Sequence, residues 1–278
     1  MTEPDRQPGH DEEFAHNVMA SMEEIFWMPE IERRGGVEKV GPIRKALAIL
    51  APGEPNEVRF NEEADLVASV IAARAIEKGE AVHDVDFSDV SDLRPVEVPK
   101  DAAWVAMVVL PNGSPMLAFD FRRNRGRGKR LLNLALEYVD TSAGALKNTR
   151  FGPALESAHA AAELAVTAMM YLSDDNPFKG RRNAHSRRKG WLNQFTRLDN
   201  APRDFHATLV KLGDLRGSAR YGDPQLDVTS EEVAALIESV RGIIEHARAR
   251  VGEPLEAIDT SGVPGVRAGL VDDESASN

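Results

Sequence analysis

The stretch of sequence that decides the fold is FGPALESAHAAAELAVTAMMYL, residues 151–172. Apolar side chains recur in it every three or four residues, which predicts an amphipathic α-helix, and Pro153 falls in the first turn, where proline is tolerated. The stripe consists of Phe151, Leu155, Ala158, Ala162, Ala165, Met169 and Leu172. The many alanines leave room for neighbouring helices to approach closely. The segment therefore predicts a helix that packs against other helices.

Helices are also predicted on both sides of this stretch, one before it and three after it. In chain order, their inward-facing stripes are Leu131, Ala135, Tyr138, Ser142 and Leu146; Trp191, Leu192, Phe195 and Leu198; Phe205, Leu209, Leu212 and Leu215; and Val233, Leu236, Val240, Ile244, Ala247 and Val251. The last helix opens with the capping box Thr229-Ser230-Glu231-Glu232, in which the side chains of Thr229 and Glu232 satisfy free backbone amides. Five amphipathic helices with short joints predict an all-α antiparallel bundle over residues 124–252.

The N-terminal part of the chain, residues 12–123, predicts an α+β module. Its first helix ends near Pro29, and we expect a second helix from Asn61 to Gly79. The runs Trp104–Leu110 and Met116–Phe121 predict two strands, joined by a hairpin at Asn112-Gly113 because both residues accept the positive φ of a tight turn. We expect a small antiparallel sheet with helices on one face. The apolar residues of the first helix are Phe14, Val18, Met22, Ile25 and Phe26.

The two chain ends, residues 1–11 and 253–278, are rich in Pro, Gly, Ser and acidic residues without apolar periodicity, so we expect disordered tails. No apolar run approaches the ~20 residues that cross a bilayer, and the acidic N-terminus does not resemble a signal peptide. These features predict a cytoplasmic protein with no membrane association. Since the chain has no cysteine and no His-Glu-x-x-His motif, we expect no metal site and no cofactor.

The net charge is −11, yet two segments are strongly basic. Six Arg and Lys residues lie between Arg122 and Arg130, and six more lie between Phe178 and Trp191, with no acidic residue in either segment. Such a patch can attract nucleic acid to a protein that is acidic elsewhere. The alternative is a solvated loop that balances a local acidic field. The glycines of residues 125–128, RGRG, indicate that the first segment is a flexible linker.

Several stretches of the bundle resemble the HEPN domain. Residues 138–146, YVDTSAGAL, and 150–154, RFGPA, are similar to its first helical hairpin, and residues 160–165, AAAELA, to its alanine-rich second helix. Residues 215–224, LRGSARYGDP, are similar to the segment before its last helix. The resemblance implies a helical bundle that commonly forms a homodimer. We expect the alanine-rich helix to offer a flat surface for that dimer.

Many HEPN proteins are metal-independent ribonucleases or toxins, whose shared motif is an arginine followed by a histidine four to six residues later. The resemblance implies that this pair meets its copy across a dimer, where the histidine acts as acid or base and the arginine stabilises phosphorane charge. Here Arg216 stands at the arginine position, Gly217 where asparagine is common, and Tyr221 where the nearest histidine is expected. A tyrosine phenol is a poor general base at neutral pH, so we do not expect robust nuclease activity.

Two histidines elsewhere are further candidates. Arg241 and His246 match the literal motif but lie inside the last predicted helix, where the alternative is a solvent-facing pair. His185 lies in the basic loop before the third helix, where it could reach a phosphate beside Arg216. The alternative is a surface histidine with no function.

The sequence therefore supports three hypotheses. The first is a HEPN-like protein that binds RNA or a nucleotide without robust nuclease activity. Its candidate binding residues are Arg216, Arg220, Tyr221, His185, Arg182, Arg187 and Arg188. The second is a metal-independent ribonuclease or toxin-like enzyme, of the kind found in toxin–antitoxin or defence systems, that uses Arg216 with His185 or Tyr221. The third is a non-catalytic module for dimerisation or for binding a protein partner.

Overall fold

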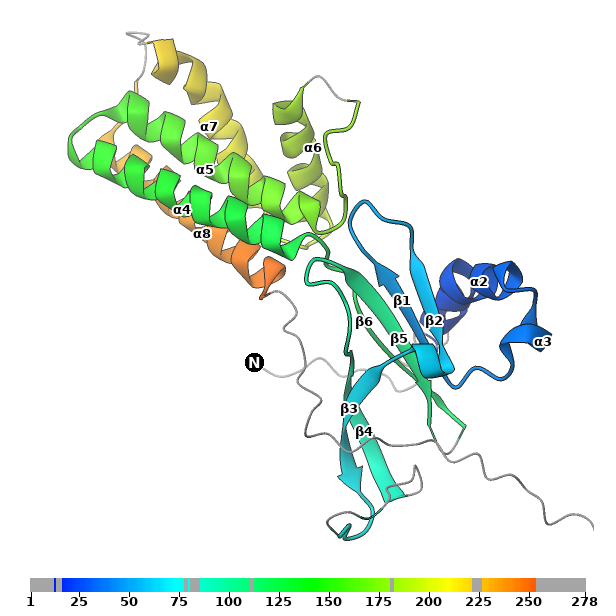
Figure 1. Ribbon diagram of the computed structural model, residues 1–278. Coiled ribbons are helices and arrows are strands. Elements are labelled where there is room, and N and C mark those ends of the chain that lie inside the picture. The colour runs from blue at the N-terminus through cyan, green and yellow to red at the C-terminus, as the bar shows by residue number, and fades with distance from the viewer. Residues whose placement is uncertain are drawn as a thin grey trace, which may run out of the picture. The chain divides into compact units, whose positions relative to one another are not determined.

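The computed structural model describes residues 13, 17–77, 80, 86–110, 113–180, 183–221 and 227–253 (Figure 1). These residues form two compact units. The N-terminal unit holds the described residues up to Pro99 together with Ala103–Asp120, and the helical unit holds Lys100–Ala102 and the described residues from Phe121 onward. The expected domain division between residues 123 and 124 stays a prediction. The expected disordered tails lie outside the described residues, apart from Glu253.

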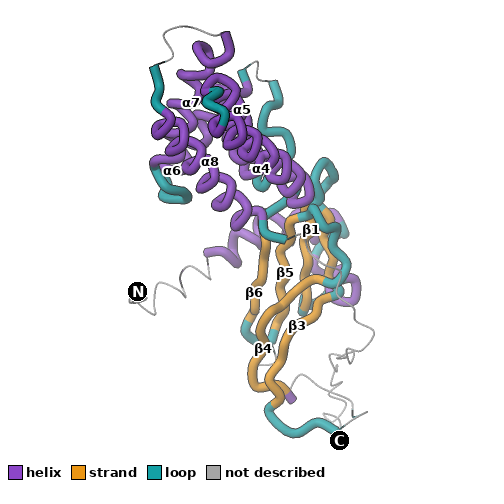
Figure 2. Tube along the Cα trace, turned by 90° about the vertical axis from the view of Figure 1, so that its left-hand side faces the viewer, coloured by secondary structure: helices purple, strands orange, loops and turns teal. Residues whose placement is uncertain are grey.

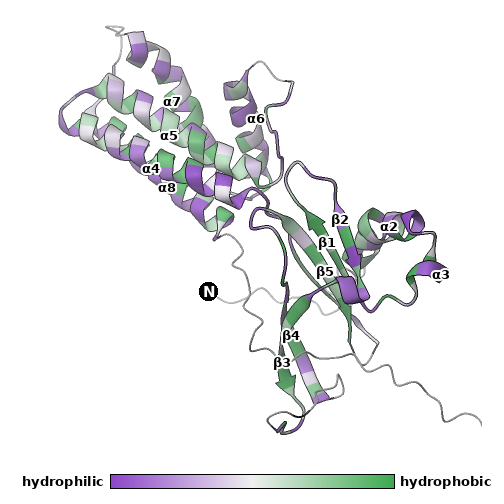
Figure 3. Ribbon diagram, in the orientation of Figure 1, coloured by the Kyte–Doolittle hydropathy of each residue, from purple (hydrophilic) through white to green (hydrophobic). Residues whose placement is uncertain are grey.

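The N-terminal unit is built on a four-stranded antiparallel sheet with the strand order β2-β1-β5-β6. Its strands are β1 (Lys45–Leu50), β2 (Glu57–Phe60), β5 (Ala103–Val109) and β6 (Pro115–Asp120). The predicted hairpin is confirmed, because β5 and β6 pair in register from Trp104 with Asp120 to Val109 with Pro115. Gly113 lies in the turn with a φ of 82°, a conformation that glycine adopts without strain. Figure 3 shows the apolar residues along β1 and β5.

One face of this sheet is covered by the helical segment η1 (Glu23–Trp27, a π-helical turn) and α2 (Met28–Arg33), with the short helix α3 (Val37–Val40) following. The buried side chains in this cluster are Met22, Phe26, Trp27 and Ile31 from the helices and Ala46, Ala48, Leu50, Phe60, Ala103, Val105 and Met107 from the strands. The helix continues through Pro29 to Arg33 instead of ending near Pro29, since proline is accommodated at the start of α2. Ile25 is 57% exposed, because the π-helical turn shifts it off the buried side.

The predicted helix from Asn61 to Gly79 is wrong. Among the described residues of this range, only Asn61–Glu63 is helical, as a single 3-10 turn (η2). Leu66–Ala72 forms β3, which pairs antiparallel with β4 (Phe87–Pro95) (Figure 2). The segment contains the β-branched residues Val67, Val70 and Ile71, which favour a strand. Pairing with β4 supplies backbone hydrogen bonds and overrides a weak helical period, and a single sequence window cannot reveal that partner.

The described residues of the helical unit form five helices, as predicted. They are α4 (Arg125–Lys147), α5 (Phe151–Tyr171), α6 (Ala184–Arg197), α7 (Asp204–Tyr221) and α8 (Ser230–Val251). The capping box of the last helix is also confirmed, because Thr229 Oγ1 accepts from the amide of Glu232 at 3.2 Å and Glu232 Oε2 accepts from the amide of Thr229 at 3.0 Å. Within the described part of the chain, no helix combines the length and apolarity that a membrane crossing requires.

Helix α5 is the centre of this bundle, and α4, α7 and α8 pack around it (Figure 1). Ala158, Ala161, Ala162 and Ala165 are fully buried against these neighbours. The alanine-rich face is therefore not a surface for dimerisation, and that part of the sequence interpretation is wrong. Small side chains serve instead to let three helices approach one axis.

Two helices begin earlier than the sequence suggested. The predicted flexible linker at residues 125–128 is wrong, because α4 starts at Arg125 and the amide of Gly126 donates to Asp101 Oδ1 at 2.6 Å. Similarly, α6 starts at Ala184, with the side chain of Asn183 accepting from the amide of Ser186 at 3.0 Å. His185 therefore lies in the first turn of a helix and not in a loop. The basic residues Arg187, Arg188 and Lys189 lie in the same helix.

We predict that Gly152→Ala destabilises the bundle while Gly144→Ala does not. A Cβ at Gly152 would lie 2.7 Å from the backbone oxygen of Ala219 on α7, so one helix must shift, whereas a Cβ at Gly144 on α4 meets nothing within 4 Å. Urea unfolding should show a loss of about 1–3 kcal/mol for Gly152→Ala and a gain of up to ~1 kcal/mol for Gly144→Ala. Equal stabilities for the two variants would contradict the close packing of α5 on α7.

Candidate functional site

A polar stripe interrupts the otherwise apolar helix α5. Glu156, His159, Glu163 and Thr167 follow one another at intervals of three or four residues, so they share one side of the helix. Helices α6 and α7 supply the groups that face this stripe. Polar side chains in so buried a position require partners, and the partners define the site.

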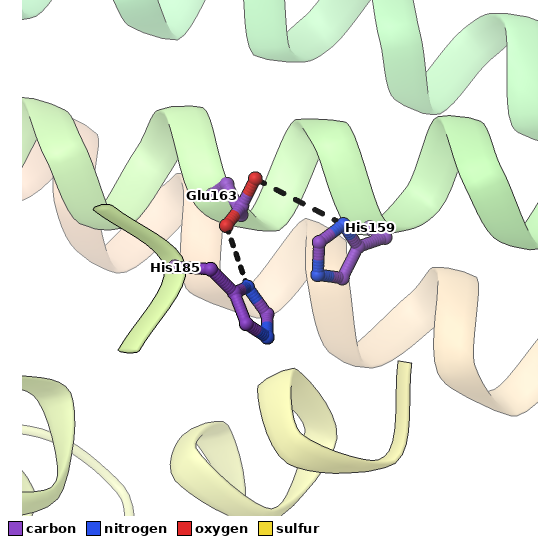
Figure 4. Close-up of side chains that lie close together, drawn as sticks. All are labelled: His159, Glu163 and His185. Atoms are coloured by element: carbon purple, nitrogen blue, oxygen red, sulfur yellow. Dashed lines mark hydrogen bonds and ion pairs between the residues drawn. The ribbon is translucent and has the colours of Figure 1, made fainter. Parts of the chain in front are cut away.

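Glu163 is the centre of the stripe. Its Oε1 accepts from His185 Nδ1 on α6 at 2.8 Å (Figure 4). The same oxygen accepts from Arg188 Nη1, also on α6, at 3.2 Å. Burial alone raises the pKa of this carboxyl, but the hydrogen bond from His185 and the charge of Arg188 outweigh it, and the pKa lies below its usual value. Glu163 is thus held as a carboxylate that joins α6 to α5.

Arg188 is fixed by more than this ion pair. Its Nε donates to Thr167 Oγ1 at 2.8 Å, and its guanidinium lies over the ring of Phe178 at 4.8 Å. The side chain is therefore positioned by three different contacts.

His159 is the most buried member of the site, with only 1% of its surface exposed. Its Nδ1 is 3.9 Å from Glu163 Oε2, and its Nε2 has no hydrogen-bond partner among the described residues. Burial is the main cause that lowers the pKa of His159 to about 4. Among the smaller effects, Glu163 and Glu156 raise this pKa, and His185 and Arg216 lower it. The ring lies 5.1 Å from that of His185, centroid to centroid (Figure 4). A neutral imidazole with an available lone pair therefore faces the same carboxylate as His185.

Helix α7 closes the site from the other side. The Nε2 of His185 lies 3.0 Å from where a Cβ of Gly213 would be, so α7 and the imidazole of α6 are in close contact here. One turn further along α7, Arg216 Nε donates to the carboxylate of Glu156 at 3.2 and 3.3 Å. Arg220 follows Arg216 by four residues, so the two share one side of α7.

The structure brings some of the predicted binding residues together and separates others. His185 and Arg188 both meet Glu163, beside the stretch of α7 that leads to Arg216. Tyr221 is 83% exposed and lies about 140° around α7 from Arg216, because five residues of an α-helix make that turn. Arg187 donates from Nε to the carbonyl of Pro177 at 3.4 Å. Arg182 lies outside the described residues.

The literal motif pair on α8 is split as well. Arg241 forms an ion pair with Asp140 on α4 at 3.3 Å. His246 packs edge-on against Phe195 and Phe205 at 6.4 and 5.7 Å, and its Nε2 is buried without a hydrogen-bond partner among the described residues. The interpretation of His246 as a solvent-facing histidine is therefore wrong.

The sequence interpretation missed Glu156, His159 and Glu163 as site residues. Their signal was present, because polar residues recurred at helical spacing along an alanine-rich helix. A stripe of that kind is an ordinary solvent-facing surface unless other helices cover it, and only the fold shows that α6 and α7 do so.

Fold and site together define a class: an α+β unit followed by an antiparallel helical bundle with a buried polar seam. Residues 129–250 match the family model of the HEPN domain. The match confirms the resemblance seen in the sequence, and it runs from α4 to α8 of the helical unit. No curated protein matches the chain.

We predict that the helical unit loses stability as the pH falls below about 6.5, partly through His246. Burial lowers the pKa of His246, the charge of Arg250 lowers it further, and the carbonyl of Asn200 opposes both. The unfolded chain then binds a proton more readily than the folded one, so stability is present above the unfolded pKa of about 6.5 and is lost below it. Unfolding by urea at pH 7.5 and 5.5 should show a smaller pH effect in His246→Phe than in wild type. An unchanged pH effect would contradict this assignment.

Proposed function

We propose that the HEPN domain binds RNA or a nucleotide through cations on the side formed by α6 and α7, without robust nuclease activity. One observation carries the proposal. Arg216 and Arg220 lie one turn apart on α7, and α6 brings His185 and Lys189 to α7 at Gly213, while Arg188 of α6 pairs with Glu163 beside His185.

The arginines retain hydrogen-bonding capacity for a ligand. Arg216 uses only its Nε for Glu156, and its terminal amino groups make no hydrogen bond to another described residue. Arg220 is exposed and has no ion pair with any residue that the structure describes. A guanidinium with open donors can bind a phosphate in a bidentate manner.

The arrangement favours a strand of RNA over a single phosphate. Gly213 and Arg220 are separated by about 10 Å along α7, and the side chains of His185 and Lys189 lie at Gly213. A chain of phosphates can contact several such groups at once. Tyr221, with 83% of its surface exposed beside Arg220, offers a ring on which a base can stack.

The absence of robust nuclease activity follows from the separation of the motif residues. Arg216 faces Glu156 while Tyr221 points elsewhere, and Arg241 and His246 contact different helices. Among the described residues, no arginine and histidine at the spacing of the HEPN motif converge on one place. A homodimer through the bundle, commonly formed by HEPN domains, remains part of this proposal, on a surface other than the buried alanine face.

We predict that Arg216→Ala and Arg220→Ala each weaken binding to a mixed RNA pool, measured by fluorescence anisotropy as a function of salt. Each substitution should lower the slope of log affinity against log salt by about 1, because one phosphate contact is lost. The cost in stability should stay within ~1 kcal/mol, since the ion pair of Arg216 is part-exposed.

Arg203→Ala is the matched control, because Arg203 lies just before the other end of α7, pairs only with Asp199 among the described residues and is 80% exposed. Equal losses in this control would mean nonspecific electrostatics. RNA cleavage in EDTA that disappears in His185→Ala would replace the binding proposal with the ribonuclease hypothesis. If the wild-type protein shows no salt-dependent binding to RNA or nucleotides, the binding proposal is wrong and the protein-interaction hypothesis replaces it.

A further inference from the structure

Three side chains from two helices of the helical unit, one buried and two part-buried, form a cluster of potential metal ligands. His159 and Glu163 lie one turn apart on α5, and His185 joins them from α6 (Figure 4). One ligand atom from each residue can be chosen so that all three lie within 4.8 Å of one another. From this geometry we propose that His159, Glu163 and His185 form a site for a divalent transition metal ion of the zinc type.

The unsatisfied state of His159 is the strongest argument for a ligand here. A histidine that is 1% exposed should have hydrogen-bond partners for its ring nitrogens. Yet Nε2 has none among the described residues, and Nδ1 is 3.9 Å from the nearest carboxylate oxygen, beyond hydrogen-bonding distance. A group that binds between the two histidines would account for this ring.

The distances suit a small ion after modest movement. Zinc bonds of about 2.0–2.2 Å in a tetrahedron place neighbouring ligand atoms about 3.3 Å apart. The present separations from Glu163 are 2.8 Å to His185 Nδ1 and 3.9 Å to His159 Nδ1. These two separations differ from the tetrahedral value by about half an ångström. The three ligand atoms lie within 4.8 Å of one another, so the widest separation must close by up to about 1.5 Å. The proton that His185 Nδ1 now donates to Glu163 would move to Nε2 as Nδ1 becomes a ligand.

The donor set selects the kind of ion. Two imidazoles and one carboxylate suit zinc and related transition metals better than calcium or magnesium, which prefer oxygen ligands. The fourth position would be filled by water or a phosphate oxygen on the side of His185, whose side chain is 32% exposed. Three protein ligands with one open position are typical of an accessible zinc site.

Arg188 does not prevent this arrangement. Its Nη1 shares Glu163 Oε1, but its Nε and its guanidinium face are held by Thr167 and Phe178. Glu163 directs Oε1 toward His185 and Oε2 toward His159, so the carboxylate can bind the ion while Oε1 still accepts from Arg188. Hydrogen bonds of this kind orient the ligating carboxylate. The sequence suggested no metal site because it has no cysteine and no His-Glu-x-x-His motif, so this inference revises that expectation.

The test is titration of the full-length protein with zinc chloride in isothermal calorimetry, with cobalt(II) chloride as a spectroscopic probe. We expect one equivalent to bind at micromolar concentration, with the visible absorption of four-coordinate cobalt. Glu163→Gln and His185→Ala should each weaken binding at least about tenfold. His206→Ala removes a histidine of α7 outside the cluster and should bind as wild type does.

Thermal unfolding with and without zinc checks that each variant is folded and gives a second readout. Zinc should raise the unfolding temperature of wild type and of His206→Ala, but not that of His185→Ala. The proposal is overturned if wild type binds no stoichiometric zinc or cobalt, or if binding survives unchanged in both Glu163→Gln and His185→Ala. Because no RNA is present, this outcome is independent of the ligand proposed for Arg216.

Discussion

The structure of the helical unit depends on the burial of α5. Three helices pack around it, and their approach is possible only because the contact positions carry alanine and, at one end, glycine. Gly152 shows how tight the constraint is, since even one methyl group there would collide with the backbone of α7. A central helix in this position has little solvent with which to satisfy a polar side chain.

The polar seam follows from that constraint. The part-buried carboxylate of Glu163 pairs with Arg188 of α6, and the part-exposed Glu156 pairs with Arg216 of α7. The pair with Glu156 holds Arg216, which lies one helical turn before the exposed Arg220. An arginine that pairs with the central helix is thus among those that the proposed function assigns to phosphate binding. His159 differs from the other residues of the stripe, because its Nε2 is buried without a hydrogen-bond partner among the described residues.

The site of this chain keeps one residue of the HEPN motif and lacks the other. Family resemblance implies an arginine and a histidine that cooperate on a phosphate. In this chain Arg216 stands at the arginine position, but the helical twist of α7 directs Tyr221 away from it. The histidine in contact with α7, His185, belongs to α6 and is hydrogen-bonded to Glu163. Because α7 continues to Tyr221, residues 216 and 221 lie on different sides of the helix. Residues five apart in a regular helix do not face the same point.

The sequence by itself determined the elements whose signals are local. The five helices, the capping box at Thr229 and the turn at Gly113 depend on neighbours a few residues away, and all are present. Two predicted members of the inward-facing stripes are wrong, because Tyr138 and Leu198 are 39% and 65% exposed. Tertiary structure decided the rest. Leu66–Ala72 became a strand because β4 pairs with it, α4 began early because Asp101 binds the amide of Gly126, and the alanine face of α5 became core because three helices surround it. The site depends on contacts of the same long range: Glu163 and His185 are 22 residues apart and Glu156 and Arg216 are 60 apart. No local periodicity encodes such distances, because the pairing arises only when the packing of apolar faces brings the helices together.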